Sequence, residues 1–191
     1  MSGDEAETRK RRIALVALGS ILEGDDGAGP AALAELSARW LVPPEVEPLD
    51  LGTPGPYLAE HLRGYDAVVL LDAVRSQLPP GTVVVETDPA RIRSAPARMS
   101  PHDPNLGEAL DLLALEGQLP EEVVVVGVVP RHVGLGTELS EEVAASIPIL
   151  AETAAHQLRR LGAPPHLREQ PLPADRWWER VEEEIKEEVL F

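Results

Sequence analysis

Three side chains that lie far apart in the chain, Asp26, Asp72 and His102, are the candidates for chemistry. Asp26 belongs to a glycine-rich acidic turn, Asp72 directly follows a continuous apolar run, and His102 precedes a predicted helix. Two carboxylates and one imidazole can bind Zn²⁺, Ni²⁺, Fe²⁺ or Mn²⁺ and leave coordination positions open for a substrate. Because carboxylates held close together repel each other, a site that contains both also favours a cation.

Each of these residues also has a purely structural explanation. Asp26 can cap a helix, Asp72 can form a turn at a strand end, and His102 can bond to nearby backbone in a loop. Taken singly, the structural role is the better interpretation of each residue. Capping requires only one aspartate, however, and the turn carries both Asp25 and Asp26.

The elements expected from the first part of the chain bring the two aspartates together. Strands and helices alternate, with strands predicted at residues 13–18, 46–51 and 67–71 and helices at 31–40 and 57–62. Right-handed crossovers place these strands in the order 2-1-3 and send the helices after strands one and three to opposite faces. The crevice that opens at the carboxyl ends of those two strands is where ligands bind in such sheets. Asp26 and Asp72 should meet there, and the loop with His102 can reach the same edge.

The second part of the core adds two strands and two helices. The strand at 82–86 follows its predecessor too closely for a helical crossover, so we expect it to be antiparallel. The other elements are a long polar loop, a helix, a second fully apolar strand and a last helix, at 88–101, 106–115, 123–129 and 140–161. Two further residues can assist the site: His132 is a reserve metal ligand, and Asp103 can orient the ring of His102.

Composition narrows the class of protein. The length of 191 residues suits one domain with short extensions, and the net charge of -16 argues against a nucleic-acid partner, which requires a basic face. The absence of cysteine excludes disulfides, thiolate metal sites and cysteine nucleophiles. No apolar run is long enough to span a membrane, and the basic and apolar start lacks the cleavage site of a signal peptide. We therefore expect a cytoplasmic protein without membrane insertion.

Changes in composition divide the chain into four parts. These are a polar and basic extension at 1–12, an α/β domain at 13–162, a Pro-rich linker at 163–174 and an acidic amphipathic helix at 175–191. One face of that last helix carries Trp177, Trp178, Val181, Ile185 and Val189. We expect this face to pack on the chain's own domain.

With these residues placed, the chain resembles the nickel-iron hydrogenase maturation endopeptidases. The resemblance covers about residues 13–162 and rests on LGSILEGDDGAGP at 18–30, VLLDA at 69–73, His102 before a helix, and VVPRHVG at 128–134. The order and spacing of these motifs agree with the family. One departure is Ser20, where the family usually has asparagine, and serine offers fewer hydrogen-bonding groups for positioning the turn.

The resemblance implies a three-layer α/β/α fold with a five-stranded mixed sheet of order 2-1-3-5-4, in which strand 4 is antiparallel. It implies an endopeptidase that removes the carboxyl-terminal extension of the hydrogenase large-subunit precursor. Asp26, Asp72 and His102 would recognise nickel already installed in that precursor, so that cleavage follows metal insertion. The partner is then the precursor, the nickel is carried by the substrate, and we expect the peptidase to be a monomer.

Other functions fit parts of the same pattern. A receiver-like phospho-acceptor domain also pairs acids after strand one with an aspartate ending strand three, but its acids follow the strand directly and a lysine ends its last central strand. A non-catalytic metal-dependent scaffold would bind the hydrogenase subunit without cutting it, and Ser20 is the change that fits lost activity. A dinucleotide site fits least, because Glu23, Asp25 and Asp26 would repel a pyrophosphate.

Overall fold

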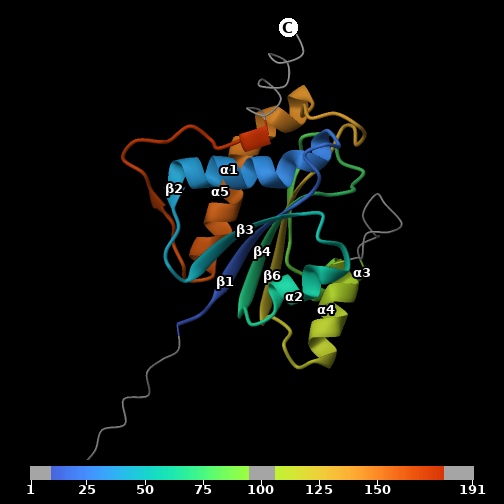
Figure 1. Ribbon diagram of the computed structural model, residues 1–191, viewed down its shortest axis with the longest axis vertical. Helices are drawn as coiled ribbons and strands as arrows, with labels where there is room; N and C mark the ends of the chain where they lie inside the picture. Colours follow the sequence, from blue (N-terminus) through green and yellow to red (C-terminus); the bar gives the residue numbers. More distant parts are fainter. Residues whose placement is uncertain (1–9, 95–105, 179–191) are drawn as a thin grey trace, which may run out of the picture.

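A five-stranded mixed sheet forms the centre of the protein in the computed structural model, which describes residues 10–94 and 106–178 (Figure 1). Its strands are β1 (Ile13–Leu18), β3 (Val46–Gly52), β4 (Ala67–Ala73), β5 (Val83–Glu86) and β6 (Glu122–Val128). Their order is β3-β1-β4-β6-β5, with β5 antiparallel to β6 and the other neighbouring strands parallel. Counted along the chain, this is the predicted order 2-1-3-5-4 with strand 4 antiparallel, which is confirmed.

Helices cover both faces of the sheet and complete the predicted three layers (Figure 1). One face is covered by α1 (Ala28–Arg39) and α5 (Glu141–Arg160), and the other by α2 (Leu58–Leu62), α3 (Pro89–Ser94) and α4 (Leu106–Leu115). Two 3-10 turns, η1 (Asp25–Gly27) and η2 (Gly55–Tyr57), lead into α1 and α2. No helix within the described parts of the chain is long and apolar enough to cross a bilayer.

The central strand β1 shows why its sequence is apolar throughout. Ile13, Leu15 and Ala17 pack in the core beneath α1 and α5, whereas the alternating residues between them pack in the core beneath α2 and α4. A parallel strand between two helical layers has no solvent-facing side, so every position is buried. The run at the start of β4 has the same explanation.

The segment after α5 is attached to the end of α1. Two short strands that the sequence did not predict, β2 (Trp40–Leu41) and β7 (His166–Leu167), form a small antiparallel sheet. Two main-chain bonds extend this contact, from Arg168 N to the carbonyl of Arg39 and from Leu172 N to that of Ala38, each at 2.9 Å. The part that we expected to be a Pro-rich linker is therefore docked along α1.

Two residues of the expected apolar face, Trp177 and Trp178, lie within the described part of the chain. Trp178 is only 8% exposed and belongs to the same core cluster as α1, whereas about half of Trp177 remains exposed. The two indole rings meet edge to face with centroids 5.9 Å apart. Trp178 therefore packs on the chain's own domain, and the rest of the predicted helix lies outside the described residues.

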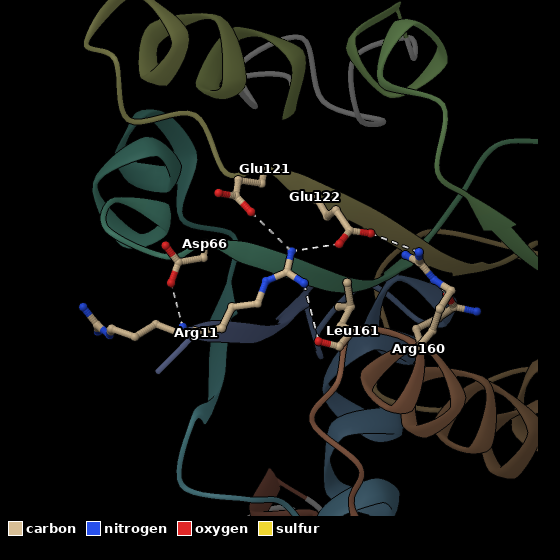
Figure 2. A network of polar contacts seen from close by, with 8 residues as sticks. Arg11, Asp66, Glu121, Glu122, Arg160 and Leu161 are labelled. Atoms are coloured by element: carbon tan, nitrogen blue, oxygen red, sulfur yellow. Dashed lines mark hydrogen bonds and ion pairs between the residues drawn. The ribbon is translucent and has the colours of Figure 1, made fainter. Parts of the chain in front are cut away.

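A charged network joins the start of the chain to the end of α5 at the amino-terminal edge of the sheet (Figure 2). Arg11 donates from Nη2 to Glu122 Oε1 at 2.8 Å, lies 3.8 Å from Glu121, and donates from Nη1 to the carbonyl of Leu161 at 3.5 Å. Arg160 donates to the second oxygen of Glu122 at 3.0 Å. The hydrogen bond from Arg11 is the main cause of a lowered pKa of Glu122, with a smaller opposing effect of desolvation.

Replacing this carboxylate should weaken the protein most at neutral pH. Because the pKa of Glu122 is lower in the folded than in the unfolded state, its contribution to stability is present at neutral pH and is lost as the pH falls through the folded pKa. Glu122→Gln should lower the free energy of unfolding at pH 7 by at most about 1 kcal/mol, because the ion pairs are partly exposed. Urea unfolding at pH 7 and pH 3.5 measures this, and an equal loss at both values would contradict it.

Candidate functional site

Glycines allow the turn after β1 to sit directly on the sheet. Gly19 has a φ of 123°, and a Cβ placed on it would lie 1.8 Å from the main-chain oxygen of Asp26. A Cβ on Gly29 would lie 2.2 Å from the carbonyl oxygen of Leu18 and 2.5 Å from that of Leu71. The first turn of α1 therefore rests on the carboxyl ends of both β1 and β4, where any larger residue would collide with backbone.

Asp26 lies in η1 and is half-buried. Its Oδ2 accepts a hydrogen bond from the main-chain N–H of Ser20 at 2.5 Å, so the carboxylate folds back over the glycine turn. The side chain of Ser20 has a different partner, since its Oγ accepts from Leu22 N at 3.3 Å. The interpretation of either aspartate as a helix cap is wrong. Gly27 occupies the N-cap position of α1, and no side chain makes a capping hydrogen bond to η1 or α1.

Asp72 lies near the end of β4, half-buried and in register with Gly127 of β6. The 3-10 turn that carries Asp26 packs against β4. The close approach of Gly29 to Leu71, the residue before Asp72, marks the same corner of the sheet. The two elements that carry the predicted carboxylates thus meet at the carboxyl edge between β1 and β4.

The third predicted ligand cannot be placed beside these two. His102 and its predicted partner Asp103 belong to residues 95–105, which lie outside the described residues. Within the described residues, no group of three or more histidine and acidic side chains could hold a metal ion. The trio of Asp26, Asp72 and His102 therefore remains a prediction.

Asp25 has a role that the sequence analysis missed. Its side chain is only 1% exposed and accepts four hydrogen bonds from the segment between β6 and α5. The donors to Oδ2 are Arg131 N at 2.8 Å, His132 N at 3.0 Å and Ser140 Oγ at 2.9 Å, and the donor to Oδ1 is Ser140 N at 2.7 Å. A carboxylate can remain buried when its oxygens are satisfied in this way. Asp25 thus clamps the segment 131–140 to the turn after β1, and the doubled aspartate was its only sign in the sequence.

Main-chain bonds add to this clamp. Gly24 N donates to the carbonyl of Gly136 at 2.7 Å, Gly136 N to that of Leu22 at 2.9 Å, and Asp25 N to that of His132 at 3.2 Å. The reserve ligand His132 therefore lies in a loop bonded to the turn that carries Asp26. Its side chain is exposed and folds over Gly134, where a Cβ would lie 2.7 Å from Nε2. A metal-binding role for His132 also remains a prediction.

A cleft of about 390 Å³ lies between α1 and the segment 168–178. Its charged lining residues are Asp50, Arg168 and Asp175. Desolvation raises the pKa of Asp50, against the lowering effect of a hydrogen bond from Gly52 N at 3.2 Å. None of the predicted site residues Asp26, Asp72 and His132 is among the residues that line this cleft.

Comparisons with known proteins agree on one family. The model of the hydrogenase maturation protease family matches residues 30–157. The hydrogenase expression/formation protein HoxM of Cupriavidus necator is 32% identical over 155 residues, which cover 80% of this chain and 77% of that protein. The hydrogenase 2 maturation protease of Escherichia coli is 30% identical over 152 residues, which cover 79% of this chain and 93% of that protein. The solved structure of the hydrogenase maturating endopeptidase HYBD from E. coli has a TM-score of 0.74 at 30% identity and covers 82% of this chain and 98% of that chain.

The two neighbouring aspartates should differ in their contribution to stability. Asp25→Asn replaces one buried acceptor oxygen by an NH₂ group that faces N–H or O–H donors, which should lower the free energy of unfolding by about 2–4 kcal/mol. The matched control, Asp26→Asn, alters a half-buried group that accepts a hydrogen bond from Ser20 N and can still accept it as an amide, so it should cost about 1 kcal/mol or less. Chemical denaturation of both variants measures the difference, and equal losses would refute the clamp.

Proposed function

This chain belongs to the hydrogenase maturation proteases, and we propose that it removes the carboxyl-terminal extension of a nickel-iron hydrogenase large-subunit precursor after nickel insertion. Membership makes the chain a peptidase that processes a hydrogenase precursor. The proposal adds what the protease recognises in that precursor. The recognised group is the nickel ion that the precursor already carries.

The observation that supports this proposal is the packing of η1, with Asp26, against β4, with Asp72, at the carboxyl edge of the sheet. Two half-buried carboxylates at one corner favour a bound cation. Together with His102 they offer three ligands, which leaves coordination positions for the ligands that the precursor supplies. The protease would then complete the coordination of nickel only when a loaded precursor docks.

Binding of the nickel ion would hold the scissile peptide next to the carboxylates. The ion can polarise the carbonyl of that peptide, or it can activate a water molecule while a carboxylate accepts the proton. The main-chain N–H of Ser20 holds Asp26 in one orientation, which supports either role. Cleavage would in this way report that metal insertion is complete.

Cleavage should depend on the nickel in the precursor. We expect the purified chain to process a nickel-loaded large-subunit precursor and to leave the nickel-free precursor intact. Mass spectrometry of the large subunit before and after incubation measures the loss of the extension. Equal processing of the two precursors, or processing of neither, would refute nickel recognition, and a stable complex without cleavage would favour the scaffold function.

The three proposed ligands should each be required for cleavage. Asp26→Ala, Asp72→Ala and His102→Ala should each lower the rate by about a hundredfold or more, because a lost ligand misplaces both the nickel ion and the peptide. Matched controls are Glu152→Ala on the exposed side of α5 and His61→Ala on α2, which should retain full rate. Circular dichroism of each variant checks that it is folded. Retention of the wild-type rate by a folded variant would remove that residue from the site.

A further inference from the structure

Two exposed leucines lie on the two bonded loops that border the candidate site. Leu22 is 58% exposed, and Leu135 is 98% exposed. A parallel bridge pairs Glu23 with Gly136, which are the residues that follow the two leucines, and Gly136 N donates to the carbonyl of Leu22. Leu22 and Leu135 therefore directly precede the two bridged residues, on loops that are bonded to each other.

The exposure of these leucines does not result from a loose loop. Four main-chain bonds join the two loops, and the Asp25 carboxylate ties both of them to the start of α5. Leu135 also stands between Gly134 and Gly136, so neither adjacent residue has a side chain to cover it. The fold thus holds an apolar pair in water on a fixed backbone, although single exposed leucines are common elsewhere.

We infer that this leucine pair is a docking contact for the hydrogenase precursor, made by an apolar side chain of the precursor next to the bond that is cut. The inference rests on the proposed function. Leu22 and Asp26 belong to the same turn, so a precursor that brings its extension to Asp26 must cover the loops that carry Leu22 and Leu135. Burial of these side chains would add affinity without touching the reacting atoms, so it changes KM and leaves kcat unchanged.

A matched set of serine variants tests the leucine pair. The double variant Leu22→Ser and Leu135→Ser should raise KM for the nickel-loaded precursor, and the Kd of their complex, by about tenfold for each leucine that becomes buried. The value of kcat and the melting temperature should not change, because neither side chain packs in the core. The control is Leu115→Ser. Leu115 is 86% exposed at the end of α4, and the chain runs from there to the start of β6, at the edge of the sheet opposite the candidate site. This control should bind and cleave like the wild type.

Binding and cleavage together separate the two proposals. Equal affinity of the wild type and the double variant for the precursor would overturn the docking contact, and so would a wild type that does not bind the precursor. An equal loss in Leu115→Ser and in the double variant would overturn it as well. A wild type that binds and loses affinity only in the double variant, but never cleaves, would refute the proposed function and support the docking contact.

Discussion

The buried carboxylate of Asp25 is the interaction on which the arrangement of the candidate site depends. Its charge is tolerated in the interior because three main-chain N–H groups and the hydroxyl of Ser140 bond to it. All four donors come from the segment between β6 and α5. The turn after β1 and that segment therefore adopt their positions together, and withdrawal of either one would leave an uncompensated charge in the core.

Two adjacent residues of identical type serve different purposes in this arrangement. Asp25 points into the protein and joins two loops, whereas Asp26 remains half-buried and accepts a hydrogen bond from the N–H of Ser20. That N–H belongs to the main chain, which every residue except proline supplies. The side chain at position 20 therefore does not affect this contact with Asp26, and the hydroxyl of Ser20 accepts a hydrogen bond from Leu22 N instead.

The sequence predicted those parts of the fold whose residue pattern alone indicates where they lie in the sheet. The apolar runs of β1 and β4 identify central parallel strands, and the short connection before β5 leaves room only for antiparallel pairing. The pairing of β2 with β7 has no local pattern, because each strand has only two residues and its partner is distant in the chain. The different directions of Asp25 and Asp26 were likewise hidden, because they depend on donors from the segment 131–140 that only the folded chain brings near.

The small sheet of β2 and β7 has a consequence for synthesis of the chain. The end of α1 obtains its strand partner from residues 166 and 167, which follow the central sheet and α5 in the chain. During translation this pairing cannot form until all five strands of the central sheet and α5 have left the ribosome. Contacts between such distant residues also form late, because the intervening chain must first be ordered. A segment made after all five strands therefore closes the structure around a helix that was made before most of them.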